Sequence, residues 1–185
     1  MTVLVDEAIW PWRGRRWAHL VSDRSLDELH ELAHRIGMPY LAFQGDHYDV
    51  HEDLRLAAIG LGAVPTPARD LVRALRAAGL RHQRAVEVWR WGGEVGLGER
   101  GAEDAIRRLR LAAPDDHDVL VAALMEVGSG SVRWGSRGGE AIVVATRPPE
   151  PGVELEPGLV RLSPGLAIHR ALGERGAFVE VVASV

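Results

Sequence analysis

Carboxylates and an imidazole follow directly after three segments that are predicted to be strands. These residues are Asp6, Asp23, His47 and Asp49. Ligands of α/β proteins bind outside the carboxyl ends of the strands, so parallel neighbouring strands would bring the four side chains together. Such a cluster suits a Mg²⁺ or Mn²⁺ ion bound by Asp6, His47 and Asp49, or acid–base catalysis by His47. Alternatively, these acidic residues cap helices and close turns, as they commonly do after strands.

A second group of residues suits an anionic substrate beside this cluster. Three tryptophans alternate with three arginines between the first two predicted strands: Trp10, Trp12, Trp17, Arg13, Arg15 and Arg16. Indole rings stack on bases, and guanidinium groups bind phosphate. We therefore expect a loop that supplies arginine to the substrate, with His19 and Gln44 as further substrate-binding residues. Packing of the tryptophans over the edge of the sheet is the alternative.

His30-Glu-Leu-Ala-His34 matches the H-E-x-x-H pattern of zinc peptidases. Such an enzyme needs a sheet before this helix, but only 29 residues precede His30. Leu29 and Leu32 belong to the apolar face of the same predicted helix, which places both histidines on its flank. We interpret the match as chance.

Short strands and helices alternate in the first 80 residues. The predicted strands cover residues 2–5, 17–21, 40–44 and 63–64. Helices are predicted at about 25–36, at 52–61 and from Thr66-Pro67 to Gly79. Ser25-Leu-Asp-Glu28 has the spacing of a capping box. The order β-β-α-β-α-β-α predicts the α/β fold class, as a small unit of two or three layers with some parallel pairing.

The second half reads as a smaller α+β unit, so we predict domains at residues 1–80 and 81–185. Its predicted strands are 86–91, 131–134 paired with 140–145 as a hairpin, and 178–182. Helices are predicted at 102–113 and from Ser163-Pro164. Residues 118–127 suit either a helix or a strand, because their apolar run does not settle the period.

Composition excludes several classes of protein. The formal charge of −4 and the pI near 6.1 do not favour binding to nucleic acid or to an anionic membrane. There is no cysteine, so disulfides and thiolate sites are excluded. The amino terminus is not typical of a signal peptide, and no apolar run reaches the length of a membrane span. We therefore expect a cytoplasmic protein.

Five stretches in the first half carry a family resemblance in their order and spacing. They are Val3-Leu-Val-Asp6, Trp17-Ala-His-Leu-Val-Ser-Asp23, Asp27-Glu-Leu-His30, Phe43-Gln-Gly-Asp-His-Tyr-Asp49 and Gly62-Ala-Val64. Residues 1 to about 80 thereby resemble the domain of unknown function 4031 family of bacteria and phages. The resemblance implies a shared fold but no reaction, and it does not extend to the second half.

The pattern of residues favours a small hydrolase acting on a phosphorylated or nucleotide-like small molecule. His47 would act as general base or metal ligand, and the aspartates would hold a divalent ion or orient His47. The arginines between the first two strands would neutralise the phosphate of the substrate. The alternative is a non-catalytic module that binds a ligand, a protein or an oligonucleotide, with the first half as a rigid platform.

Overall fold

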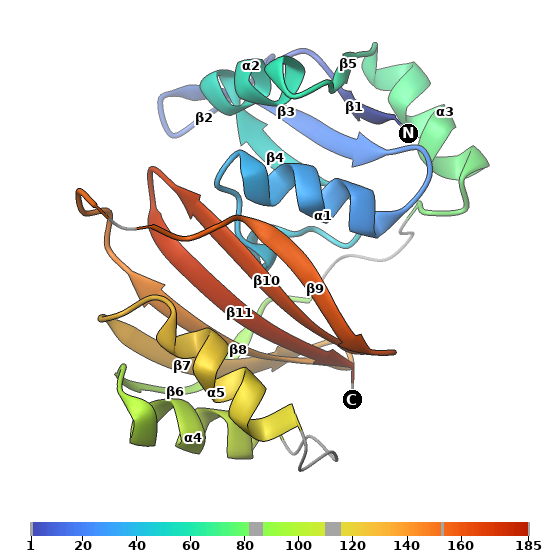
Figure 1. The fold of residues 1–185 in the computed structure, drawn as a ribbon. Coiled ribbons are helices and arrows are strands. Elements are labelled where there is room, and N and C mark those ends of the chain that lie inside the picture. Colours follow the sequence, from blue (N-terminus) through green and yellow to red (C-terminus); the bar gives the residue numbers. More distant parts are fainter. Residues whose placement is uncertain (1, 82–86, 110–115, 153, 185) are drawn as a thin grey trace. The chain divides into compact units, whose positions relative to one another are not determined.

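The protein folds into two compact units, Met1–Val86 and Glu87–Val185 (Figure 1). The computed structural model describes residues 2–81, 87–109, 116–152 and 154–184. Together the units contain five α-helices and two β-sheets in these residues, so the fold is mixed α/β. No helix in the described part of the chain is both long and apolar enough to cross a membrane.

The first unit is built on a five-stranded sheet with its longest strand in the middle. Its strands are β1 (Val3–Val5), β2 (Trp10–Trp12), β3 (Arg15–Ser22), β4 (Tyr48–His51) and β5 (Val64–Pro65). Antiparallel pairing joins β3 to β4 along one edge and to β1 and β2 along the other, and β5 lies parallel to β1. Strand β3 thus runs opposite to its neighbours β1 and β4, whereas the predicted site required parallel neighbours.

Two segments of the first unit differ from their prediction. Residues 40–44, predicted as a strand, begin with the short 3-10 helix η1 (Tyr40–Ala42), and the polar run that follows supplies β4. The segment from Trp10 to Trp17, predicted as a loop, is a hairpin of β2 and β3. Its turn residues Arg13 and Gly14 both have positive φ, 50° and 76°, which matches the right-handed twist of the paired strands.

Three helices complete the first unit: α1 (Leu26–Arg35), α2 (Glu52–Gly60) and α3 (Ala68–Ala77). All three were predicted. The Ser25 hydroxyl accepts a hydrogen bond from the Glu28 backbone N–H at 3.3 Å and so caps α1, as the sequence predicts. The Glu28 carboxylate does not return to Ser25 but accepts from the Ser22 hydroxyl at 2.8 Å. Helices α1 and α2 lie on opposite sides of the sheet (Figure 1).

Alternation along the strands gives the sheet two different faces. Val5 and Leu20 on one face are fully buried, as are their neighbours on β4. On the other face Leu4 and Val21 pack against Leu71 and Leu75 of α3. Further along β3 the same face carries Trp17 and His19, because residues two apart in a strand share a face. Helix α3 therefore covers one end of this face, and Trp17 and His19 lie at the other end.

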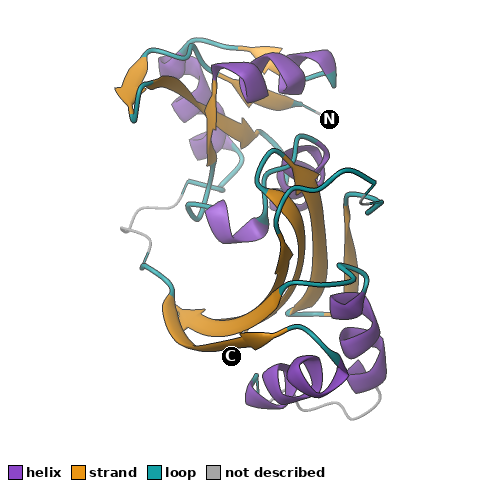
Figure 2. Ribbon diagram, turned by 90° about the vertical axis from the view of Figure 1, so that its left-hand side faces the viewer, coloured by secondary structure: helices purple, strands orange, loops and turns teal. Residues whose placement is uncertain are grey.

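The second unit is a six-stranded antiparallel sheet with two helices against one face (Figure 2). Its elements are β6 (Arg90–Gly96), α4 (Glu99–Arg108), α5 (His117–Met125), β7 (Ser131–Arg137), β8 (Glu140–Arg147), β9 (Gly158–Ser163), β10 (Leu166–Gly173) and β11 (Gly176–Ser184), and the strand order is β6-β7-β8-β11-β10-β9. Ile106 and Leu124 of the helices share a buried core with Val143 and Val179 of the sheet.

Predictions for the second half are confirmed in part. The hairpin around Gly138-Gly139 and the last strand are present, and residues 118–127 are mostly helical. The helix predicted from Ser163-Pro164 is wrong, because Ser163 ends β9 and Pro164 and Gly165 form the turn to β10. Residue 86 of one predicted strand and residues 110–113 of one predicted helix lie outside the described residues.

Candidate functional site

Asp6 holds the ring of His19 from the end of the neighbouring strand. The Asp6 carboxylate is buried, and its Oδ2 accepts a hydrogen bond from His19 Nδ1 at 2.7 Å. Its Oδ1 accepts from the backbone N–H of His19, also at 2.7 Å. Arg55 of α2 fixes the aspartate in turn, because its Nε donates to the Asp6 carbonyl at 2.6 Å. The His19 ring is therefore held with its Nε2 directed away from Asp6.

Asp46 holds His47 in the same way. His47 Nδ1 lies 2.5 Å from Asp46 Oδ1, and the Asp46 carboxylate is almost fully buried. The other oxygen of Asp46 forms an ion pair of 2.8 Å with the guanidinium of Arg81, which follows α3. Two histidines thus each have a buried carboxylate on Nδ1, and this arrangement fixes the tautomer that leaves the Nε2 lone pair available.

Both Nε2 atoms face the carboxylate of Asp49. Asp49 Oδ1 lies 3.5 Å from His47 Nε2 and 4.0 Å from His19 Nε2. His19 and Asp49 are direct partners in the register of β3 and β4, so their side chains leave the same face of the sheet. One ligand atom from each of His19, His47 and Asp49 lies within 4.8 Å of the other two. We call Asp6, His19, Asp46, His47 and Asp49 the Asp49 cluster.

The charges of the Asp49 cluster are mutually dependent. Burial lowers the pKa of His47, but the carboxylates of Asp49 and Asp46 outweigh it, and the pKa is raised above its ordinary value. The His47 imidazole in turn lowers the pKa of Asp49, against a smaller opposing contribution from burial. Asp49 is consequently a carboxylate at neutral pH and an acceptor for either a proton or a cation.

The three inner side chains have the donor set of a transition-metal centre. Tetrahedral coordination with bonds of about 2.0 to 2.1 Å separates neighbouring ligand atoms by about 3.3 Å. The distances of 3.5 Å and 4.0 Å to Asp49 exceed that separation by less than one ångström. Two imidazoles with one carboxylate suit Zn²⁺ or Fe²⁺ better than Mg²⁺, which prefers oxygen ligands. His19, His47 and Asp49 are thus the residues able to hold a metal. Asp6, predicted as a metal ligand, instead accepts the hydrogen bond from His19 Nδ1, on the opposite side of the ring from Nε2.

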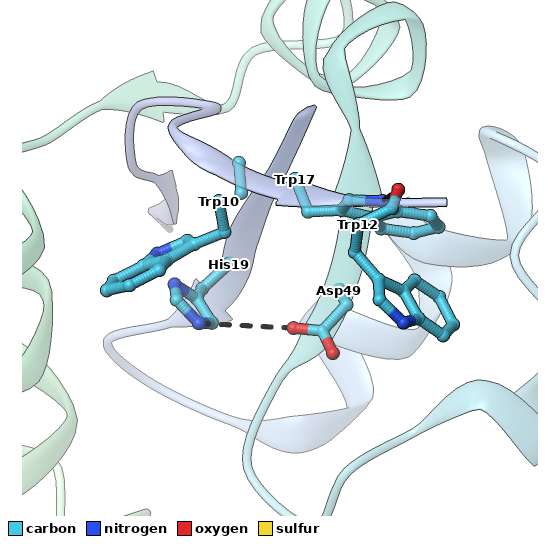
Figure 3. A pocket seen from close by; sticks show the side chains of 6 residues that line it. Trp10, Trp12, Trp17, His19 and Asp49 are labelled. Carbon is cyan, nitrogen blue, oxygen red and sulfur yellow. Dashed lines mark hydrogen bonds and ion pairs between the residues drawn. The ribbon is translucent and has the colours of Figure 1, made fainter. Parts of the chain in front are cut away.

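Tryptophan side chains form the walls of a pocket over this cluster. The tryptophan pocket has a volume of about 200 Å³ and is lined by Trp10, Trp12, Trp17, Ala18, His19 and Asp49. Figure 3 shows Trp10 and Trp12 on either side of the pair formed by His19 and Asp49. A ligand in the tryptophan pocket would therefore contact aromatic rings at its sides and the Asp49 cluster at its base.

The remaining predicted site residues lie at different places. Asp23 is at the opposite end of the sheet from Asp6, beside the carbonyl of Thr2, because β1 and β3 are antiparallel. Arg13 stacks on Trp12, with its guanidinium carbon 4.5 Å from the ring centre.

None of the three arginines, Arg13 included, lines the tryptophan pocket, and neither does Gln44. Arg15 pairs with Trp12 in the hairpin and shares its face, whereas Arg16 pairs with Pro11 on the other face. The Gln44 backbone N–H donates to the His47 carbonyl at 2.9 Å and closes the turn before β4, while its side chain is exposed.

The two histidines of the H-E-x-x-H match are buried, not on the flank of the helix. His30 Nδ1 lies 2.8 Å from the hydroxyl of Tyr48, and His34 Nδ1 lies 2.9 Å from the carbonyl of Met38. Their rings stack with centroids 6.2 Å apart. Both side chains belong to the packing beneath α1.

Sequence reasoning missed Asp46 and Arg81, the two residues that orient His47. Asp46 directly precedes His47, but adjacency in the chain does not indicate that the Asp46 carboxylate accepts a hydrogen bond from the His47 ring. Arg81 is 35 residues from its partner Asp46. His19 was predicted to bind substrate, and its place opposite Asp49 depends on a register that the local sequence does not specify.

Comparison with known proteins agrees with the family resemblance of the first unit. Residues 3–78 match the family described as "Protein of unknown function (DUF4031)". No curated protein and no solved structure matches the chain. The matched segment contains the whole Asp49 cluster.

Proposed function

We propose that the first unit is a metal-dependent hydrolase of a phosphorylated small molecule, with its centre at the Asp49 cluster. His19, His47 and Asp49 bind one divalent transition-metal ion. The observation that carries the proposal is the pair of buried aspartates, since Asp6 and Asp46 each hold a histidine Nδ1 and leave Nε2 directed at one carboxylate. Metal-binding histidines in proteins almost always have such a carboxylate or carbonyl partner.

Each residue then has a defined part in the reaction. A divalent ion supplies Lewis acidity toward a phosphate oxygen and lowers the pKa of water. His19 and His47 bind through Nε2, and Asp6 and Asp46 keep the two rings oriented. Asp49 is half-exposed and adds the negative charge that attracts the cation. Arg13, which stacks on the Trp12 ring, would neutralise the phosphate of the substrate.

Isothermal titration calorimetry with Zn²⁺, Mn²⁺ and Mg²⁺ tests the metal site. We expect one Zn²⁺ per chain, weaker binding of Mn²⁺ and the weakest binding of Mg²⁺, because two of the three donors are imidazoles. His47→Ala and Asp49→Ala should remove the binding. Asp6→Asn, which weakens only the support of His19, should lower the affinity by roughly 10- to 100-fold.

Asp23→Asn is the matched control, because Asp23 also follows a strand but lies at the other end of the sheet. It should bind Zn²⁺ as the wild type does. Circular dichroism of each variant checks that the fold is retained. Equal Zn²⁺ affinities for the wild type and a folded Asp49→Ala variant would rule out the metal centre.

Turnover is tested separately with the Zn²⁺-loaded protein. We expect hydrolysis of p-nitrophenyl phosphate or bis(p-nitrophenyl) phosphate that is lost in Asp49→Ala and kept in Asp23→Asn. Tight metal binding without turnover of either ester would reject the hydrolase and favour the alternative, a module that binds its ligand without converting it.

A further inference from the structure

Two tryptophans of the first unit are exposed on one face of a short hairpin. Trp10 and Trp12 are 54% and 56% exposed, although large aromatic side chains usually bury most of their surface. They are two residues apart on β2 and therefore leave the same face of the sheet, toward the tryptophan pocket. Two indole rings thus flank one small space (Figure 3).

The hairpin holds these rings in place before any ligand binds. The Trp17 Nε1–H donates a hydrogen bond to the carbonyl of Trp12 at 2.9 Å. The Trp12 ring meets the Trp17 ring edge-on at 5.3 Å, and the Trp10 ring meets the His19 ring edge-on at 6.4 Å. Because the rings are already ordered, a ligand that stacks on them loses little of its binding energy to side-chain entropy.

The size and lining of the tryptophan pocket select a flat ring. Its volume of about 200 Å³ is below the range of pockets for drug-sized ligands, roughly 300 to 1,000 Å³, and suits a single ring system. His19 and Asp49 are its polar side chains, and the proposed function assigns both to the metal. A sugar ring needs several hydrogen-bond partners for its hydroxyls, whereas a nucleobase binds through its π faces.

We propose that the tryptophan pocket binds the base of a nucleotide, which stacks on Trp10 and Trp12. The guanidinium of Arg13 lies 4.5 Å from the ring centre of Trp12 and supplies positive charge for the phosphate. The stacked nucleobase then positions the phosphate of the same nucleotide at the Asp49 cluster, whose His19 and Asp49 form the floor of the tryptophan pocket. The choice of a nucleotide as substrate rests on the proposed function, while the stacking of the base is a separate property of the hairpin.

Binding of the four nucleoside 5′-monophosphates, ribose 5-phosphate and inorganic phosphate tests this assignment by calorimetry, with and without Zn²⁺. At least one nucleotide should bind more tightly than ribose 5-phosphate. Trp10→Ala and Trp12→Ala should each weaken that nucleotide by roughly 5- to 150-fold, the range for loss of one stacking partner. Neither variant should change the affinity for Zn²⁺, and Trp10→Ala should not change the affinity for ribose 5-phosphate.

Trp91→Ala is the matched control, because Trp91 is a partly exposed tryptophan of β6 in the second unit. It should bind nucleotide as the wild type does. Trp12→Phe, which keeps a flat ring, should recover part of the affinity lost in Trp12→Ala. Shifts of the Trp10 and Trp12 indole N–H signals in NMR spectra, with the Trp91 signal unchanged, would locate the base directly.

The assignment is overturned if nucleotides bind no better than ribose 5-phosphate, or if both alanine variants keep wild-type affinity. Normal Zn²⁺ binding with either result refutes only the nucleobase pocket. Nucleotide binding to the metal-free protein, together with failure of Zn²⁺ to bind, refutes the metal centre and leaves the stacking of the base intact.

Discussion

His34 makes the stability of the first unit depend on pH. Its ring is fully buried beneath α1, and this burial lowers its pKa to about 4, although the hydrogen bond to the Met38 carbonyl acts in the opposite direction. In the unfolded chain the pKa returns to 6.5. Between these two values the unfolded chain binds a proton that the native protein excludes, so acid favours unfolding.

The size of this effect follows from the difference between the two pKa values. A difference of about 2.5 units, at about 1.4 kcal/mol for each, corresponds to about 3 kcal/mol. The contribution of His34 to the free energy of unfolding is fully present above pH 6.5. It decreases as the pH falls through this window, and about 3 kcal/mol has been lost near pH 4.

Replacement of His34 by glutamine isolates this contribution. Glutamine does not titrate, and its amide can still donate to the Met38 carbonyl. The free energy of unfolding in urea is measured from the NMR signals of α1, for wild type and His34→Gln, between pH 4 and pH 7. Titrations common to both proteins cancel, so the stability of the wild type relative to the variant should fall by about 3 kcal/mol on acidification.

His117→Gln controls for the loss of any histidine, because His117 is partly exposed and belongs to the second unit. Its difference from wild type should change little over the same range. The argument is refuted if the difference in free energy of unfolding between wild type and His34→Gln stays constant within about 0.5 kcal/mol from pH 7 to pH 4. His34 would then have the same pKa in the native and the unfolded protein.

Two further substitutions test local features of each unit. Ser25→Ala removes the hydroxyl that caps α1 at the Glu28 N–H and should cost about 1 kcal/mol, measured by urea unfolding; no measurable loss would contradict the cap. Gly176→Ala places a methyl group 2.0 Å from the carbonyl of Arg147 at a φ of +108° and should cost at least about 2 kcal/mol in thermal or urea unfolding. Gly138→Ala, also at positive φ but with nothing within 4 Å, should cost less, and equal losses would contradict the steric argument.

Local signals in the sequence predicted most of the helices and the hairpin of the second half. They did not predict which strands of the first unit pair with one another. The cap at Ser25 and the apolar face of α1 are coded by residues within one segment, so this helix was found. The strand β4 was missed, because Tyr48-Asp-Val-His51 is short and polar next to the more apolar residues 40–44. Its alternation places Tyr48 and Val50 in the core, and pairing with β3 decides the outcome.

The strand arrangement that forms the candidate site differs from the one predicted from the sequence. Asp6, His47 and Asp49 were grouped on the assumption that they follow parallel strands. In the structure Asp49 lies within a strand and faces His19 across an antiparallel pair, and Asp6 reaches the same histidine from the end of β1. Antiparallel pairing also removes Asp23 from the group. Strand direction and register depend on contacts far apart in the chain, which a local pattern does not contain.

The ion pair between Arg81 and Asp46 bears on where this domain ends. The family match stops at residue 78, yet the cation that neutralises Asp46 lies three residues further on. A fragment trimmed to the limits of the family match would keep both histidines and all three aspartates of the Asp49 cluster but lose this counterion. Asp46 would then be a buried carboxylate without its arginine, so the smallest intact version of the site extends at least through Arg81.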